Sequence, residues 1–339
     1  MRGVAAILTV LLLSIAGLTG CISNAEEKQK GNGVLEEIVS NENNYNCFEF
    51  EGQERCWLTY IPEGINESSE APLILELHGW SFSSFEQRNL SDITDLADDV
   101  GAIVLHPEGL SFPDSGASGP GEESWNAGAC CGDAAVLDIN DSGFLIELIQ
   151  RTIEELPIDK NRVYLTGWSN GCMMSQRLAL EASHLIAAVA CTSGYLGYND
   201  LSSYAPIPIL EMHGFLDEVA LYTNSARIAL FEEDSRNIEA IQTGATENLY
   251  DWASNNGCNG ILPDVNNPGV VYSVQSFTSC ENDTEVTLIT VHGGAHNLYG
   301  NNVVANGYPL PGNQGLYDTN QIFWDFMSKY SKDSFEGVE

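Results

Sequence analysis

Short apolar runs alternate with stretches of helical period along most of the chain. The runs cover residues 56–61, 73–78, 102–106, 162–166, 186–191, 207–213 and 286–291. Each has the length of a strand that is buried on both faces. Between them, apolar residues recur at three- and four-residue spacing, most clearly over 90–100, 144–153 and 322–330. The alternation predicts an α/β fold with a mostly parallel central sheet and helices on both faces.

Two stretches, 109–133 and 219–246, lack either pattern and are long for connections between strands and helices. We expect them to roof a site. The sequence contains no internal repeat and no linker to a second domain.

The first residues have the pattern of an export signal. Arg2 precedes an apolar run over residues 4–18, which is shorter than the ~20 residues of a membrane-spanning helix. The run ends in Leu18-Thr19-Gly20-Cys21, which resembles a prokaryotic lipobox with Cys21 as the lipidated residue. The alternative is an ordinary secretory signal with a chance cysteine. The chain is predicted to comprise a signal peptide, a flexible tether and one globular domain, over residues 1–20, 21–45 and 46–335.

Composition narrows the function further. The 339 residues include 48 acidic and 13 basic side chains, for a formal net charge of −35. Nucleic-acid binding needs Lys and Arg to neutralise phosphates, so this charge argues strongly against it. Its simplest interpretation is solubility in salty surroundings. A hydrophobic content of 43% excludes a disordered chain.

Nine cysteines indicate an oxidising compartment. With Cys21 set aside the number is even, so all the others could pair. Cys47 and Cys56 flank a predicted hairpin whose turn is Glu51-Gly52, and this spacing predicts a disulfide. The chain has no Cys-x-x-Cys spacing, so we expect no metal or other cofactor.

The sharpest motif is Gly167-Trp168-Ser169-Asn170-Gly171, which follows one predicted strand and precedes a helical stretch. This is the strand–turn–helix context of a nucleophile elbow, in which Ser169 would stand exposed at a helix N-terminus. A serine nucleophile needs a base, and the base needs an orienting carboxylate.

The order serine, acid, histidine is typical of this arrangement. His296 lies in a loop after the run 286–291, and we expect it to be the base, with His292 as the competitor. Asp217 follows the run 207–213 and is the expected acid. The other aspartates considered in that interval are Asp251, Asp264 and Asp283.

An oxyanion hole needs two fixed N–H donors. The amide of Asn170, directly after the nucleophile, is one candidate. The amide of Trp80, which follows the run 73–78, is the second. We expect His78 to support that loop and not to react.

Together these segments resemble the polyhydroxybutyrate-depolymerase-like and feruloyl esterases of the α/β-hydrolase fold, over residues 55–330. The most specific strings are Asn126-Ala127-Gly128-Ala129-Cys130-Cys131-Gly132 and Ser169-Asn170-Gly171-Cys172-Met173-Met174. The resemblance implies the triad Ser169, Asp217 and His296, and a disulfide between Cys258 and Cys280. The chain departs from the family at Cys172, where glycine is usual, and at Asn297-Leu298, where Trp-Pro is frequent.

The four remaining cysteines keep alternatives open. Cys172 and Cys191 lie on elements that neighbouring strands would bring close, and either pair or stay as buried thiols. Cys130 and Cys131 either bond to each other or exchange with that pair.

The sequence therefore predicts an exported, lipid-anchored, monomeric serine esterase whose acyl-enzyme chemistry acts on polymer or plant-type esters. Aromatic candidates for the substrate pocket are Trp125, Tyr195, Phe215 and Tyr299. Other interpretations are an acetyl-xylan esterase, a peptidase, or a surface binding protein on an inactive hydrolase scaffold.

Overall fold

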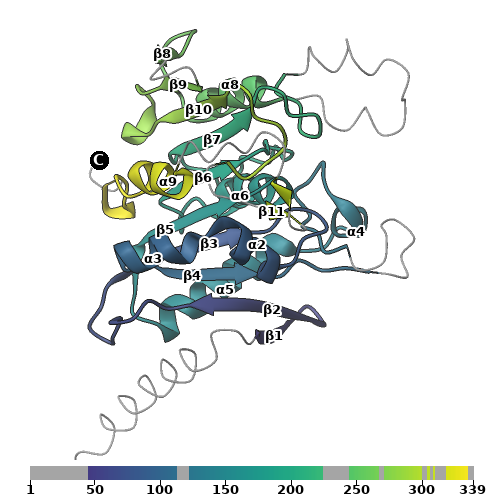
Figure 1. Ribbon diagram of the computed structural model, residues 1–339. Coiled ribbons are helices and arrows are strands. Elements are labelled where there is room, and N and C mark those ends of the chain that lie inside the picture. Colours follow the sequence, from purple (N-terminus) through teal and green to yellow (C-terminus); the bar gives the residue numbers. More distant parts are fainter. Residues whose placement is uncertain are drawn as a thin grey trace, which may run out of the picture.

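The computed structural model describes residues 45–112, 122–223, 244–266, 271–299, 304–305, 308–309 and 318–334 (Figure 1). The predicted signal peptide, the lipid site at Cys21 and the tether up to residue 44 lie outside this part of the chain. Parts of the two stretches expected to roof a site lie outside it too. Among the helices that are described, none is both long enough and apolar enough to cross a bilayer.

Ten strands form one sheet in the order β1-β2-β4-β3-β5-β6-β7-β10-β9-β8. Strands β4, β3, β5, β6, β7 and β10 are mutually parallel, and an antiparallel hairpin continues the sheet at each edge. The strands are β1 Asn46–Phe50, β2 Gln53–Tyr60, β3 Ala71–Leu77, β4 Ile103–Pro107, β5 Ile158–Gly167, β6 Ala188–Thr192, β7 Ile209–Gly214, β8 Asp264–Asn266, β9 Tyr272–Phe277 and β10 Val286–Val291. A separate antiparallel pair consists of β11 Val304–Ala305 and β12 Tyr308–Pro309.

Helices cover both faces of this sheet (Figure 1). They are α2 Ser84–Ser91, α3 Ile93–Val100, α4 Gly132–Val136, α5 Asp141–Glu155, α6 Asn170–Glu181, α8 Ala245–Asn255 and α9 Thr319–Met327, with 3₁₀ turns η1 Glu281–Asp283 and η2 Lys332–Ser334. Each predicted run contains or overlaps a strand of the sheet, and the predicted α/β class with its mostly parallel sheet is confirmed.

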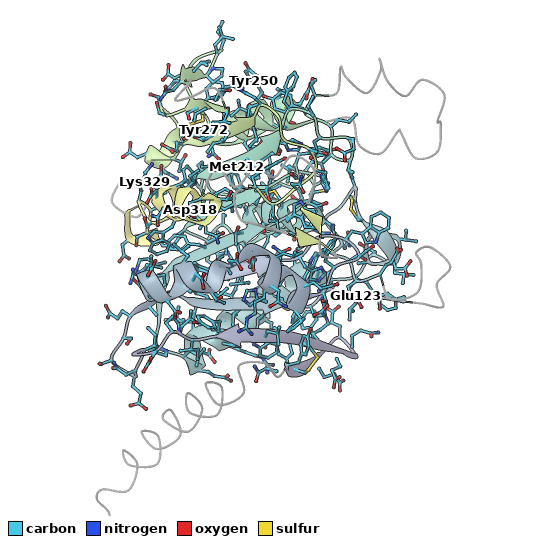
Figure 2. All side chains as sticks on the ribbon, viewed as in Figure 1. Glu123, Met212, Tyr250, Tyr272, Asp318 and Lys329 are labelled. Carbon is cyan, nitrogen blue, oxygen red and sulfur yellow. A yellow bond between two sulfur atoms is a disulfide. The ribbon has the colours of Figure 1, made fainter. Side chains whose placement is uncertain are left out.

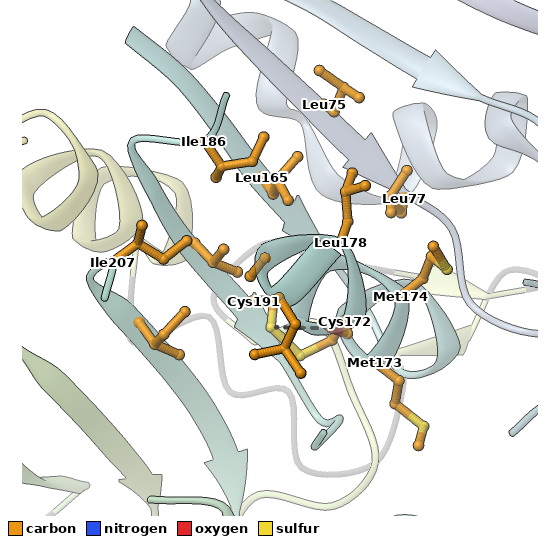
Figure 3. Packing of buried hydrophobic residues seen from close by; sticks show 14 of the residues in the cluster. Leu75, Leu77, Leu165, Cys172, Met173, Met174, Leu178, Ile186, Cys191 and Ile207 are labelled. Carbon is orange, nitrogen blue, oxygen red and sulfur yellow. Dashed lines mark hydrogen bonds between the residues drawn. A yellow bond between two sulfur atoms is a disulfide. The ribbon is translucent and has the colours of Figure 1, made fainter. Parts of the chain in front are cut away.

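The core divides by the two-residue period of the strands. On β3, Leu75 and Leu77 pack in the cluster formed with α5, α6 and α8, whereas Ile74 packs in the cluster formed with α3 and α9. Figure 3 shows Leu75 and Leu77 beside Leu178 and Met174 of α6. Helix α6 is thereby fixed against β3.

Two local features differ from expectation. The helical period over 90–100 predicts one helix, but Asp92 adopts a left-handed conformation (φ 53°) and separates α2 from α3. The edge hairpin of β8 and β9 has no counterpart among the predicted strands. Its inner strand packs on α8, where the ring of Tyr250 (Figure 2) lies 5.6 Å from that of Phe277.

Four disulfides occur in the described residues, and they link Cys47 to Cys56, Cys130 to Cys131, Cys172 to Cys191 and Cys258 to Cys280. Cys47 and Cys56 face each other in the register of the first hairpin. Its turn residues Glu51 and Gly52 both have positive φ, as a tight two-residue turn requires. The alternatives left open by the sequence are thus resolved in the structure as an adjacent pair and a pair between α6 and β6.

Candidate active site

Ser169 lies in a sharp turn between β5 and α6. Its φ of 55° and ψ of −119° are unusual for a residue with a side chain. Glycine is required around it, because a Cβ on Gly171 would lie 2.1 Å from the Leu77 carbonyl oxygen, and one on Gly167 would lie 2.7 Å from Gly171. The Ser169 amide donates to Thr192 O at 2.9 Å, which ties the turn to β6. The local structure is that of a nucleophile elbow.

The structure brings Ser169, His296 and Asp217 into one hydrogen-bonded chain. Ser169 Oγ lies 2.9 Å from His296 Nε2, and His296 Nδ1 lies 2.9 Å from Asp217 Oδ2. Since a carboxylate only accepts, Nδ1 carries the proton and Nε2 is left to accept from the serine hydroxyl. The sequence separations of 127 and 79 residues are bridged by the ends of three parallel strands.

Backbone hydrogen bonds join the loops that carry the acid and the histidine. We call residues 215–220 the acid loop and residues 292–297 the histidine loop. Phe215 N donates to Val291 O at 2.9 Å, and Leu216 N donates to Gly294 O at 2.8 Å. The position of His296 relative to Asp217 therefore rests on main-chain contacts between β7 and β10, which are adjacent in the sheet.

Asp217 is surrounded by donors. Its Oδ1 accepts from Val219 N at 2.9 Å and from Ala220 N at 2.8 Å, so the acid loop folds around its own carboxylate. The Asp217 side chain is fully buried, whereas 12% of the His296 side chain is exposed. Solvent thus reaches the histidine and the serine but not the acid.

The competing residues lie elsewhere. His292 contacts Ser273 of β9 at 3.1 Å. The three alternative aspartates occur in α8, in the edge strand β8 and in η1. None of these four takes part in the hydrogen-bonded chain of Ser169.

The two candidate oxyanion donors are held by a second layer of contacts. Asn170 is the first residue of α6, where the backbone N–H has no partner within the helix. Its side chain forms two hydrogen bonds with the backbone of Trp125. Asn170 Oδ1 accepts from Trp125 N at 2.7 Å, and Asn170 Nδ2 donates to Trp125 O at 3.0 Å. The loop of Trp80 is supported by His78, which donates from Nδ1 to Gly79 O.

His78 is neutral in this position. Complete burial lowers its pKa from 6.5 to about 4. Its Nε2 accepts from Gly109 N at 2.8 Å, and the Trp125 indole donates to His78 O at 3.1 Å. His78 therefore links three loops behind the candidate oxyanion hole, in the supporting role that the sequence predicts.

The aromatic pocket candidates divide by exposure. Phe215 is 56% exposed and Trp80 is 44% exposed. In contrast, Trp125, Tyr195 and Tyr299 are buried, and Trp125 and Tyr299 are held by hydrogen bonds that fix neighbouring loops. Burial leaves these three no surface for a substrate, so only Phe215 remains of the four candidates, and the exposed Trp80 is added as a second candidate contact.

Sequence reasoning missed three residues around the candidate triad. Trp168 packs against the His296 ring. Glu211 and His213, both on β7, lie fully buried behind Asp217. The sequence did carry a signal for Glu211 and His213. They are polar residues two positions apart within an apolar run, and such residues need hydrogen-bond partners when they are buried.

Metal-ligand residue types gather in one place within the described residues, at Cys47, Glu54 and Cys56. Both cysteines there form a disulfide. This group therefore offers no thiolate to an ion.

A family model described as Phospholipase/Carboxylesterase matches residues 138–240, which include Ser169 and Asp217. Feruloyl esterase B from Piromyces equi is 29% identical over 241 residues, covering 70% of this chain and 41% of that protein. A bifunctional acetylxylan esterase/xylanase from Neocallimastix patriciarum is 29% identical over 163 residues, covering 48% of this chain and 21% of that protein. The chain thus spans less than half the length of either relative.

Among solved structures, an acetyl xylan esterase from Aspergillus awamori superposes with a TM-score of 0.57. The alignment covers 84% of this chain and 99% of that chain, at 16% identity. The protein therefore has the α/β-hydrolase fold. Within that fold it is feruloyl-esterase-like in sequence.

Proposed function

We propose that the protein is a serine carboxylic ester hydrolase with Ser169, His296 and Asp217 as its triad. The proposal rests on the unbroken contact from Ser169 Oγ through both nitrogens of His296 to Asp217. The nucleophile elbow and the similarity to feruloyl and acetylxylan esterases support the same chemistry.

The reaction proceeds through an acyl-enzyme. His296 Nε2 takes the Ser169 proton as Oγ attacks the ester carbonyl carbon, and the carbonyl oxygen becomes an oxyanion that accepts from the Asn170 and Trp80 amides. The tetrahedral centre collapses, the C–O bond to the alcohol breaks, and His296 gives its proton to the departing alkoxide. Water then attacks the acyl carbonyl carbon while His296 takes a proton from it. The second tetrahedral centre collapses, the bond to Ser169 Oγ breaks, and His296 gives the proton to Oγ as the carboxylic acid is released.

The proposed substrates are esters of polymers or of plant and algal material. Phe215 and Trp80 supply exposed aromatic surface on the acid loop and on the loop of the candidate oxyanion hole. Such surface suits an aryl acyl group, as in a feruloyl ester, or an apolar polyester segment. Acetylated xylan is the second candidate, because one sequence relative and the superposed solved structure are acetylxylan esterases.

Export and anchoring form the remaining part of the proposal. Four disulfides in the described residues suit an oxidising compartment. Cleavage before Cys21 and acylation of its thiol would hold the hydrolase domain at a membrane through the tether. Mass spectrometry of the N-terminal peptide tests this part, and an unmodified, uncleaved N-terminus contradicts it.

The test of activity compares wild type with Ser169→Ala on p-nitrophenyl acetate, methyl ferulate, acetylated xylan and a hydroxybutyrate film. We expect hydrolysis by wild type, loss of about 10³-fold or more in kcat for the variant, and covalent labelling of Ser169 by a fluorophosphonate. A folded wild type that neither hydrolyses any ester nor reacts with the probe indicates a binding protein on an inactive scaffold.

A further inference from the structure

A buried pair of acidic and basic side chains lies directly behind the candidate catalytic acid. His213 is the fifth residue of β7, and Glu211 lies two positions before it on the same side of the sheet. His213 Nε2 lies 3.4 Å from Asp217 Oδ2, and His213 Nδ1 lies 2.6 Å from Glu211 Oε1. The His213 ring is thus placed between two carboxylates.

The contacts of Nε2 fix one proton on the ring. Nε2 lies 2.6 Å from Ala220 O, and a carbonyl oxygen can only accept. Nε2 therefore carries a hydrogen, which is shared between the backbone of the acid loop and the Asp217 carboxylate. This contact holds the far end of the acid loop against β7.

The contacts of Nδ1 place a second proton between His213 and Glu211. Glu211 Oε2 accepts from Asn248 Nδ2 at 2.6 Å, and Asn248 Oδ1 accepts from Leu196 N at 2.9 Å. Asn248 is therefore oriented as a donor. Burial raises the pKa of Glu211, and the hydrogen bonds from His213 and Asn248 oppose that shift by favouring the ionised form. An ionised Glu211 needs a hydrogen on Nδ1.

The surrounding groups favour a charged ring. Besides Glu211, the described side chains beside His213 are Asp217 of the acid loop, Tyr222 in the segment after it and Thr290 of β10. Asn248 of α8 contacts the pair through Glu211. Burial raises the pKa of Tyr222, so Tyr222 stays neutral. Burial alone would lower the pKa of His213, but the hydrogen bond and charge of Glu211, with the charge of Asp217, outweigh it and raise that pKa.

We propose that Glu211 and His213 form a protonated positioning pair that anchors Asp217 and keeps an imidazolium behind it. This role rests on the proposed ester hydrolase function. Both residues are buried, so neither is placed to contact substrate. The positive ring attracts the Asp217 carboxylate and repels positive charge on His296 more than Glu211 offsets, because Glu211 contacts the other nitrogen of the ring.

The variant Glu211→Gln separates charge from geometry. A glutamine can accept from Asn248 through Oε1 and donate through Nε2 to an unprotonated Nδ1, so the contacts of His213 survive while both charges disappear. We expect the acid limb of the pH profile of kcat/KM to move upward by about half a pH unit. KM at the pH optimum should stay within about twofold, because the substrate contacts are unchanged.

The chain offers a matched control. Glu76 and His106 form another buried pair, with His106 Nδ1 3.0 Å from Glu76 Oε2, on strands β3 and β4. Glu76→Gln removes the same charge from a similar environment that does not contact the triad. We expect it to lower the melting temperature and to leave the acid limb where wild type has it.

A second measurement does not depend on a variant with activity. Nitrogen NMR of wild type with labelled histidine should show both ring nitrogens of His213 protonated from pH 6 to 8, its signal being assigned by its loss in His213→Gln. The proposal is overturned if only one ring nitrogen of His213 is protonated. It is also overturned if the acid limb of Glu211→Gln coincides with that of wild type. If wild type lacks ester hydrolysis and fluorophosphonate labelling, the proposed function fails instead, and the NMR result still decides the protonation of His213.

Discussion

The indole of Trp168 packs on the imidazole of His296, with ring centroids 5.5 Å apart and planes inclined by 36°. Trp168 is itself 6% exposed, and the ring of Phe82 also packs on it, with centroids 4.9 Å apart and planes inclined by 71°. Trp168 directly precedes the candidate nucleophile, so one turn of chain supplies both Ser169 and the surface against which His296, the candidate base, packs.

Trp168→Ala removes this surface. We expect kcat to fall about tenfold, because the His296 ring can then rotate away from Ser169. KM should change little, because the exposed aromatic surface is unchanged. Trp168→Phe retains a ring and should recover most of the loss. Equal losses in both variants, measured with p-nitrophenyl acetate, would contradict the packing role and point to the indole N–H.

Asn170 combines a candidate oxyanion-hole amide with a side chain that is hydrogen-bonded to Trp125. Asn170→Ala keeps the backbone N–H but removes both bonds to Trp125, and we expect the free energy of unfolding to fall by about 2–3 kcal/mol. Urea denaturation measures the change. Asn66→Ala, in an exposed turn, is the control and should cost no more than about 0.5 kcal/mol. Similar losses at both positions would show that the Trp125 bonds contribute nothing beyond exposed ones.

The pattern of neighbouring residues was sufficient to predict the buried strands and the turn at Ser169. Strands such as β7 and β10 are continuous apolar runs, and the elbow is specified by glycines within five residues of one another. The half-buried β9, with the sequence Tyr-Ser-Val-Gln-Ser-Phe, carries no such run. It is a strand because β10 offers a free edge, which the sequence does not display.

The candidate site divides in the same way. Ser169, Asp217 and His296 each follow a recognisable strand, so chain order alone placed them at one edge of the sheet. The roles of Glu211 and His213 depend on partners in α8 and the acid loop, which only the folded chain brings near. Trp125 was misjudged as a pocket residue because composition cannot distinguish an aromatic at the surface from one behind a loop.

The disulfides should differ in their resistance to reduction. Cys47 is exposed on an edge strand, whereas Cys172 and Cys191 are both fully buried. Dithiothreitol without denaturant should therefore open the Cys47 to Cys56 bond first and leave the α6–β6 bond closed. Alkylation followed by peptide mass spectrometry measures both. Simultaneous loss of the two bonds would mean that global unfolding precedes reduction.

The net charge of −35 predicts a response to salt. Repulsion among exposed carboxylates is screened as the Debye length falls from about 10 Å at 0.1 M to about 3 Å at 1 M. We expect the melting temperature to rise with NaCl and kcat/KM for a neutral ester to hold or increase up to seawater ionic strength. An equal osmolality of sucrose controls for solute exclusion. A steep loss of activity with NaCl would remove the case for salt adaptation.

His78 predicts a pH dependence of stability. Its pKa is lowered by burial to about 4, from 6.5 for an exposed histidine. As pH falls from 6.5 towards 4, His78 binds a proton in the unfolded chain but stays neutral in the folded protein. The free energy of unfolding should therefore fall in this window, by at most about 1.4 kcal/mol per pH unit from this residue.

His78→Gln can still accept from Gly109 N but does not titrate. The variant should be less stable than wild type at pH 7, and the difference should shrink as pH falls to 4, because wild type alone loses the contribution of the neutral histidine. His184→Gln, at an exposed position, should run parallel to wild type across the same range. Urea unfolding at half-unit pH steps measures the three curves. A constant gap between His78→Gln and wild type would mean that His78 is protonated in the folded protein, and Nε2 could then no longer accept from Gly109.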